Sequence, residues 1–200
     1  MSDFPEIVPP VRVLGLCGSR RAGSYNRSLL RTAAGLAPAG MEVVEHDLGA
    51  LPFFDPDLPP TAPRPRAVAA FIAAVEAADA LLIATPEYNY CAPAMLTNAL
   101  DWASQPPASS PLKGKVAALM GASTGIGGTI RAQMQLRNSF VYTQVSAVLQ
   151  PEVLVAAAHT KFTPEGELVD EVARRFIARL MRALADQVLR HRTAETPILV

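Results

Sequence analysis

The sequence is poor in the residues that build metal centres and covalent frameworks. Its two cysteines, Cys17 and Cys91, stand far apart and form no C-x-x-C pair, which argues against a disulfide framework. The three histidines, His46, His159 and His191, show no H-x-x-H or H-E-x-x-H spacing. Because zinc sites rely on such spacings, the sequence gives no support for a bound metal ion.

The chain also lacks an excess of charge and any long apolar run. Its 18 basic and 18 acidic side chains give a formal net charge of zero, which argues against nucleic acid or an anionic membrane as a partner. No run approaches membrane-spanning length, and residues 1–10 carry acids and prolines rather than the apolar core of a secretory signal. We therefore expect a soluble, cytoplasmic protein.

The 200 residues, half of them hydrophobic, suffice for one well-buried domain, which we place at residues 11–190 between a leader (1–10) and a tail (191–200). Short apolar runs alternate five times with helical patterns, which favours a parallel sheet covered on both faces. The expected strands cover residues 11–16, 40–47, 80–84, 115–120 and 152–156. The sequence thus predicts an α/β, three-layer, doubly wound fold with a five-stranded parallel sheet of order 2-1-3-4-5.

The helical patterns cover residues 27–37, 67–77 and 130–142, with a further helix beginning at Pro93 and a long closing helix opened by Pro164 and Glu165. One apolar stripe runs along the closing helix. Its members are Val172, Phe176, Ile177, Leu180, Leu184 and Val188. Residues 48–66 are rich in proline and predict a flap over one sheet edge, in which Phe53 and Phe54 need something to pack against.

The loop after the first strand combines glycine, hydroxyl groups and arginine ahead of a helix. Such a loop offers an anion the amides of a helix N-terminus, supported here by Ser19, Ser24, Asn26 and either Arg20 or Arg21. The lysine of a nucleoside-triphosphate loop and the G-x-G-x-x-G of dinucleotide folds are both missing, so a monophosphate fits better. An ordinary serine-capped helix is the alternative.

The loop after the third strand organises the rest of the chain. Between Pro86 and Pro93 it presents Glu87, Tyr88 and Asn89 together with a second tyrosine, on a segment stiffened by the two prolines. Aromatic faces and loop amides suit a flat heteroaromatic ligand. The tyrosines could equally cover the sheet edge, and this loop alone leaves the two interpretations even.

The loop after the fourth strand, residues 121–129, holds four glycines in eight residues, which lets the backbone approach a flat ligand closely. A flexible loop is the alternative. All three loops fall at the carboxyl ends of neighbouring strands, where doubly wound folds bind their ligands. Together they predict a site for a phosphorylated heteroaromatic cofactor.

Three groups of residues resemble those of a known family, the NADPH-dependent FMN reductases of flavodoxin-like fold, which include quinone, azo-dye and chromate reductases. The groups are Gly18-Ser19-Arg20 with Ser24 and Asn26; Pro86-Glu87-Tyr88-Asn89 with Pro93, Asn98 and Asp101-Trp102; and Gly121-Ala122-Ser123 through Gly127-Gly128 to Arg131. The resemblance spans residues 11–190.

The resemblance implies FMN as cofactor and assigns residues to it. It implies that Ser19, Arg20, Ser24 and Asn26 hold the FMN phosphate, that Pro86, Glu87, Tyr88 and Asn89 line the isoalloxazine, and that Ser123, Gly125, Gly127 and Gly128 lie along the other edge of the ring. The chain departs from the family at Thr97, where relatives usually have Lys, and at Cys91, where a small residue is common. We expect Cys91 to be buried apolar filler.

The resemblance further implies an enzyme that takes hydride from NADPH onto FMN and passes electrons to a quinone, azo compound, chromate or free flavin. No nucleophile, base and orienting acid can be assembled, so no catalytic side chain is predicted and the chemistry centres on the flavin. A flavodoxin-type one-electron carrier and a non-catalytic regulatory module are the alternatives. Family members commonly form homodimers or homotetramers, and we expect residues 95–102 and the 198–200 tail to form the interface.

Overall fold

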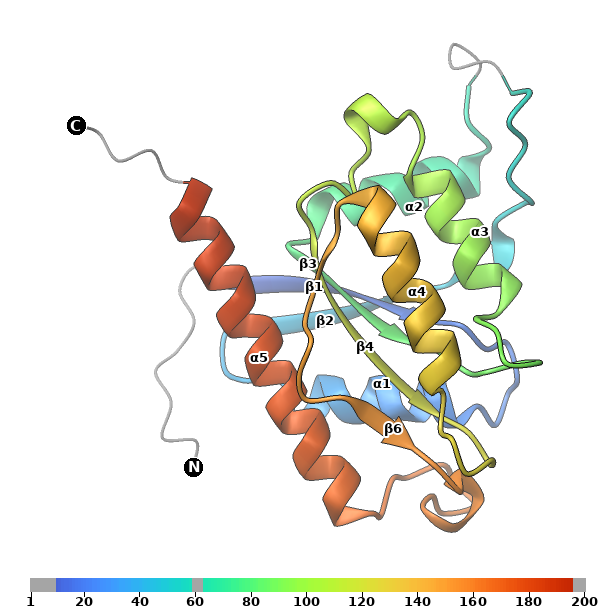
Figure 1. Ribbon diagram of the computed structural model, residues 1–200, viewed down its shortest axis with the longest axis vertical. Coiled ribbons are helices and arrows are strands. Elements are labelled where there is room, and N and C mark those ends of the chain that lie inside the picture. The colour runs from blue at the N-terminus through green and yellow to red at the C-terminus, as the bar shows by residue number, and fades with distance from the viewer. Residues whose placement is uncertain (1–9, 59–62, 196–200) are drawn as a thin grey trace.

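The structure is a computed structural model that describes residues 10–58 and 63–195, and its centre is a parallel sheet (Figure 1). The strand order is β2-β1-β3-β4-β5, and β6 also pairs with β4. All of these pairs are parallel. The strands are β1 (Val11–Cys17), β2 (Met41–His46), β3 (Ala80–Ala84), β4 (Val116–Ala122), β5 (Ser146–Ala147) and β6 (Val153–Val155). The predicted doubly wound fold of order 2-1-3-4-5 is confirmed.

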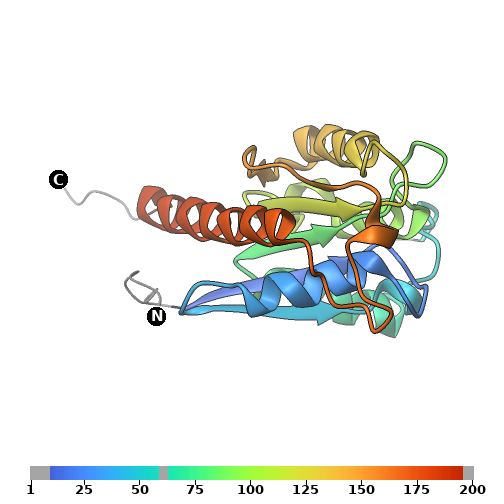
Figure 2. The same cartoon turned by 90° about the horizontal axis from the view of Figure 1, so that it is seen from below.

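Helices cover both faces of the sheet, so that the domain has three layers (Figure 1), and Figure 2 looks onto the face that carries the first and last helices. One face packs against α1 (Tyr25–Gly35) and α5 (Glu171–Glu195), and the other against α2 (Arg66–Ala77), α3 (Ala94–Ala103) and α4 (Ile130–Thr143). The central strands β3 and β4 are buried along their whole length. Because both of their faces are covered, these strands appear in the sequence as continuous apolar runs.

The far edge of the sheet is built from two short strands instead of one. The expected fifth strand corresponds to β6, which pairs with the end of β4. The two-residue β5, which pairs with the start of β4, was not predicted. Between β5 and β6 the chain moves away from β4 and then returns to it. Two separate short strands therefore form this edge of the sheet.

The closing helix begins later than the sequence indicates. Residues after Pro164 form a turn in which the Gly166 N–H donates to the Thr163 carbonyl, with Gly166 at a φ of 85°. The helix starts at Glu171, where the Asp170 carboxylate accepts a hydrogen bond from the Ala173 amide at 2.7 Å. The helix continues to Glu195, past the expected end of the domain. In the predicted stripe, Val172 and Phe176 are 52% and 38% exposed, whereas the four later members are buried.

The proline-rich excursion begins with the 3-10 helix η1 (Leu48–Ala50) and is tied to α3. Asn98 donates to the Pro52 carbonyl and accepts from the Phe54 amide, and the Trp102 indole N–H also donates to Pro52. Phe54 packs edge-on against Trp102 as expected. Phe53 is 84% exposed, so its predicted packing is wrong. Because Asn98 bonds to the backbone of Pro52 and of Phe54, the Phe53 side chain between them points into solvent.

Candidate functional site

Three loops converge at the carboxyl end of the sheet, after the neighbouring strands β1, β3 and β4. The first two are in direct contact, since a Cβ on Gly18 would stand 2.6 Å from Leu96, 2.7 Å from Pro93 and 2.9 Å from Pro86. Only glycine allows the first loop to pass this close to the start of α3. The convergence predicted from the sequence is confirmed.

The first loop leads into α1 with its helix amides presented at the site. Ser24 is the N-cap of α1, and its hydroxyl accepts from the Arg27 amide at 3.3 Å. The amides of Tyr25 and Asn26 have no acceptor within the helix, as is general for a first turn. Ser19 is 5% exposed, and its hydroxyl accepts from the Arg21 amide and from the Tyr88 hydroxyl, each at 3.4 Å. Ser19 therefore joins the first loop to the second.

Asn26 uses its side chain inside the protein. The carboxamide donates to the Ala122 carbonyl at 2.9 Å and accepts from the Ala122 amide at 2.8 Å. Both polar ends of this 4% exposed side chain thus hold the start of α1 against the end of β4. Any contact of Asn26 with a phosphate is left to its backbone N–H.

The three arginines of this region point to different partners. Arg20 donates from Nη1 to the Gly49 carbonyl of η1 at 3.3 Å, and it remains exposed. Arg21 lies over the ring of Tyr25, with 5.4 Å from its guanidinium carbon to the ring centre. Arg27 pairs with Glu45 at 3.0 Å, which neutralises its charge. Arg20 and Arg21 are therefore the cations that can turn toward an anion at α1.

The second loop contains a tight turn built from bulky residues. Tyr88 and Cys91 exchange two backbone hydrogen bonds of 3.1 and 2.9 Å, and Asn89 and Tyr90 between them have φ values of 52° and 66°. Positive φ at both central positions is the pattern of a type I′ turn. Asparagine tolerates this conformation, whereas tyrosine adopts it at a cost. Tyr88, Asn89 and Tyr90 are all exposed at the site.

Glu87 anchors this turn to α4. Its carboxylate accepts from the amides of Arg131 and Ala132 at 2.9 and 3.1 Å, and from Nη1 of Arg131 at 3.0 Å. The side chain of Thr129, the residue preceding α4, does not cap the helix. The Glu87 carboxylate caps it instead, from another loop. The Arg131 guanidinium also lies 3.9 Å from the centre of the Tyr90 ring. A carboxylate with these three partners, 7% exposed, has a structural role.

The glycine-rich third loop is held by its backbone. The Ser123 amide donates to Val155, the Ala158 amide donates to Ser123, and the Ala157 amide donates to Gly125. The Ser123 hydroxyl accepts from the Gly125 amide at 3.2 Å. Gly128 has a φ of 58° and packs against the Leu154 backbone. The loop is thus fastened to β6 and to the 3-10 helix η3 (Ala158–Thr160), while Gly125 stays exposed.

Two contacts of the site were not predicted. Gly121 lies so close to Thr129 and to the Thr85 carbonyl that a Cβ there would collide with both. Gln135 of α4 accepts a hydrogen bond from the Ala92 amide at 2.7 Å. The residues of the second contact are separated by 43 positions, and no spacing in the sequence relates them.

The two cysteines lie in different environments. Cys17 is buried, and burial raises the pKa of its thiol. Cys91 is exposed in the tight turn, so its expected role as buried filler is wrong. The turn directs the side chain at this position outward because the backbone of Cys91 bonds to Tyr88. Within the described residues, no three His, Cys, Asp or Glu side chains are grouped to hold a metal ion.

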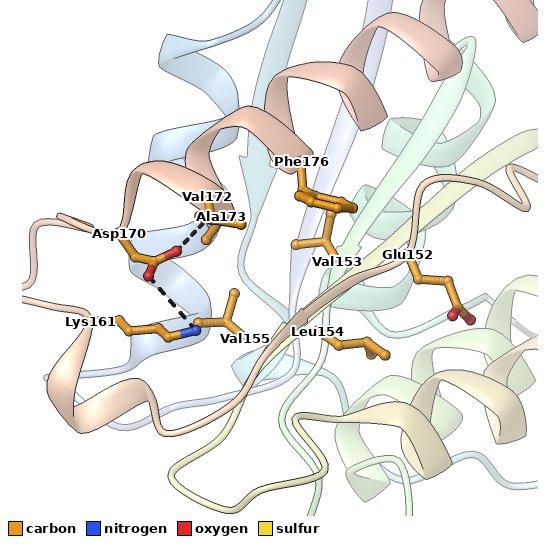
Figure 3. A pocket seen from close by; sticks show the side chains of 9 residues that line it. All are labelled: Glu152, Val153, Leu154, Val155, Lys161, Asp170, Val172, Ala173 and Phe176. Carbon is orange, nitrogen blue, oxygen red and sulfur yellow. Dashed lines mark hydrogen bonds and ion pairs between the residues drawn. The ribbon is translucent and has the colours of Figure 1, made fainter.

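A pocket of about 170 Å³ lies elsewhere, between β6 and the start of α5 (Figure 3). Its only charged pair is Lys161 with Asp170 at 3.9 Å, and Asp170 is already the cap of α5. The lining residues are Glu152, Val153, Leu154, Val155, Lys161, Asp170, Val172, Ala173 and Phe176. None of them is a predicted site residue, although Leu154 and Val155 also contact the third loop.

Known proteins similar to this chain were identified by sequence. The sequence model of one family, described as NADPH-dependent FMN reductase, matches residues 11–160. An NAD(P)H-dependent FMN reductase of Pseudomonas aeruginosa is 44% identical over 174 residues, which are 87% of this chain and 93% of that protein. An NAD(P)H:quinone oxidoreductase of Solanum tuberosum is 39% identical over 181 residues, covering 88% and 92%.

A solved structure agrees with these sequence matches. The flavoenzyme FerB of Paracoccus denitrificans, an NAD(P)H:(acceptor) oxidoreductase, superposes with a TM-score of 0.81 at 31% identity. The match covers 90% of this chain and 98% of that one. The likeness therefore extends over almost the whole fold.

Proposed function

The chain belongs to the NADPH-dependent FMN reductase family, and from this membership we propose that the three converging loops form its flavin site. The protein is an FMN-dependent oxidoreductase that takes hydride from NAD(P)H and passes electrons to a small acceptor. One observation carries the assignment of the site: a capped helix N-terminus, an aromatic type I′ turn and a glycine loop meet at the carboxyl end of adjacent strands.

The FMN phosphate is assigned to the N-terminus of α1. The amides of Tyr25 and Asn26 and the hydroxyls of Ser19 and Ser24 are donors of the kind that a phosphate needs, and the helix dipole adds favourable charge. Arg20 is exposed beside them and supplies the cation. The donor set therefore fits a monophosphate without a metal ion.

The isoalloxazine ring is assigned to the space between the second and third loops. Pro86, Glu87, Tyr88 and Asn89 form one wall, and Ser123 with Gly125, Gly127 and Gly128 forms the other. A Cβ added to the exposed Gly125 would meet only the Ser123 hydroxyl, at 3.6 Å, so the loop backbone is open at this point. The redox chemistry is supplied by bound FMN, and the protein's part is to bind, orient and shield it.

Arg20 provides a direct test of the phosphate assignment. Replacing it, Arg20→Met, removes a charge-assisted hydrogen bond and is expected to raise the Kd for FMN about tenfold. Riboflavin, which has no phosphate, is expected to bind the wild type and Arg20→Met equally. Arg190→Met, which changes an exposed arginine near the C-terminal end of α5, is the matched control. Equal loss of FMN and riboflavin affinity would contradict this assignment.

Quinones are the proposed class of acceptor. Support comes from the names of relatives in Solanum tuberosum and Escherichia coli, which are quinone reductases at 39% and 36% identity. The competing acceptors are azo compounds, chromate and free flavin. Steady-state kinetics with a benzoquinone, an azo dye, chromate and free FMN decide the question, and the largest kcat/KM identifies the acceptor class.

The visible spectrum of the purified protein with FMN, followed by anaerobic NADPH, tests the activity itself. Stoichiometric bleaching of bound flavin is expected for the reductase. Bound flavin that stays oxidised would favour a one-electron carrier, and a protein that takes up no FMN would favour a non-catalytic module. Comparing the bleaching of bound flavin by NADPH and by NADH under the same conditions measures the preference between the two donors.

A homodimer or homotetramer is proposed, with α4 at the interface. The expected interface on α3 is largely inside the subunit, because Leu96, Leu100 and Trp102 are buried, and residues 198–200 lie outside the described part of the chain. The exposed apolar residues of α4 are Ile130, Met134, Val141 and Tyr142. Light scattering at micromolar concentration tests assembly, and a monomer would contradict it.

A cytoplasmic location is also proposed. In the described residues no helix has the length and apolarity to cross a bilayer. Fractionation of cells that express the tagged chain from its own promoter tests the location directly.

A further inference from the structure

The tight turn of the second loop is fixed to α4 at both ends. At its start the Glu87 carboxylate accepts from the first amides of α4. At its end the Ala92 amide donates to Oε1 of Gln135 at 2.7 Å. Arg131 and Gln135 stand four positions apart on α4, so the two attachments lie on one face of the helix.

The turn needs such attachments because its backbone is unfavourable. Asn89 and Tyr90 both have positive φ, and for a residue with a side chain this costs free energy unless the surroundings enforce it. Two backbone hydrogen bonds close the turn internally, but they do not fix its place on the protein. Glu87 and Gln135 fix that place on α4, and the Tyr88 hydroxyl adds a 3.4 Å contact with Ser19 of the first loop.

Ala92 shows why the second attachment matters. The residue is only 8% exposed, and its amide needs an acceptor that the turn itself does not provide. Gln135 is exposed on α4, yet its side chain reaches across to meet this amide. Loss of the acceptor would leave a largely buried donor unpaired, which favours a different position for the turn.

We propose that Gln135 is a positioning residue of the flavin site, which acts through the Ala92 amide to hold Tyr88 and Asn89 in place before FMN binds. The inference rests on the proposed function, because Tyr88 and Asn89 belong to the assigned wall of the ring. A preorganised wall binds more tightly, since the ordering of the turn is complete before the ligand arrives.

The test compares three variants of the full-length protein. Gln135→Leu removes the acceptor at similar size, and Gln135→Glu keeps an acceptor. Asn138→Leu places the same leucine on exposed α4, at a side chain that takes no part in holding the turn. Fluorescence titration measures the Kd for FMN, and hydrogen exchange of the Ala92 amide is followed in flavin-free protein. For Gln135→Leu we expect a Kd about tenfold higher and exchange about tenfold faster. Gln135→Glu and Asn138→Leu are expected to match the wild type.

Each outcome decides a separate question. An unchanged Kd in Gln135→Leu, or an equal loss in Asn138→Leu, would overturn the role of Gln135 while the flavin site stands. Failure of Gln135→Glu to keep the wild-type Kd would show that the acceptor is not what matters. If the wild-type protein takes up no FMN, the flavin site fails and the positioning role fails with it. The absorption spectrum of bound FMN is a further readout. A displaced wall in Gln135→Leu is expected to shift this spectrum relative to the wild type, whereas a purely structural role of Gln135 would leave it unchanged.

Discussion

The tight turn at residues 87–92 and the glycine loop at residues 123–128 flank the same site but are held in opposite ways. The turn carries bulky side chains at positive φ and is fixed by side chains, chiefly Glu87 and Gln135. The glycine loop carries few side chains and is fixed by backbone hydrogen bonds to β6 and η3.

This difference predicts how each region responds to substitution. A region fixed by side chains fails when a partner is removed, whereas a region fixed by its backbone fails when a side chain is added where no room exists. The effects on folding stability should therefore differ in kind as well as in size.

Gly121→Ala is expected to be the most damaging change, because Gly121 joins the two regions at the end of β4. An added methyl group collides with Thr129 before α4 and with the Thr85 carbonyl after β3. Neither neighbour can yield easily, since both are completely buried. Overpacking of this kind should lower the free energy of unfolding by about 3 kcal/mol, measured by urea denaturation.

Gly35→Ala is the matched control for that experiment. A Cβ on Gly35 meets nothing within 4 Å, and the residue lies at the end of α1. The change should stabilise the protein by up to about 1 kcal/mol through helix propensity. Similar losses in both variants would contradict the steric explanation for Gly121.

Glu87→Ala tests the side-chain attachment of the turn. It leaves the first amides of α4 uncapped and removes the partner of Arg131. The loss should be about 2 kcal/mol in the free energy of unfolding. Glu87→Gln keeps an acceptor oxygen and should lose about half as much. Equal losses in the two variants would mean that packing, and not hydrogen bonding, accounts for the contribution of Glu87.

Asn89 tests the backbone strain of the turn with a pair of small substitutions. Asn89→Ala places a residue that disfavours positive φ at a φ of 52° and should cost about 1 kcal/mol. Asn89→Gly relieves the same strain and should leave stability almost unchanged. Thermal unfolding of the pair measures the difference, and a more stable alanine variant would rule out the left-handed conformation at this position.

The fold was predictable from the sequence because its signals are local. Buried runs such as Ala80–Ala84 are bounded by turn residues, and their carboxyl ends place the loops at one edge. The start of α5 was misplaced because Pro164 and Glu165 resemble a helix start, whereas Gly166 forms a turn and Asp170 supplies the cap. The β5 strand has only two residues and gives no pattern.

The partners within the site were not predictable, because they join distant parts of the chain. The sequence predicts Asn26 as a phosphate ligand and does not reveal that its carboxamide bonds to Ala122, 96 positions away, so that only its backbone N–H is left for a phosphate. The sequence identifies Glu87 as a loop residue and does not reveal that its carboxylate caps α4. The sequence predicts Cys91 as buried filler because it does not reveal that the backbones of Tyr88 and Cys91 bond to each other in a tight turn, which leaves Cys91 exposed.

Gly125→Ala should have the smallest effect on stability and sharpens the contrast with the turn. Gly125 is not at positive φ, and an added Cβ would meet only the Ser123 hydroxyl, at 3.6 Å. The free energy of unfolding should therefore change by less than about 1 kcal/mol, in the stabilising direction. If the ring of FMN lies against this backbone, the same methyl group should raise the Kd for FMN at least tenfold, measured by fluorescence titration. Glu87→Ala would then lower stability in a region held by side chains, while Gly125→Ala would lower ligand affinity without lowering stability in a region held by its backbone. Unchanged FMN affinity in Gly125→Ala would place the ring away from the glycine loop.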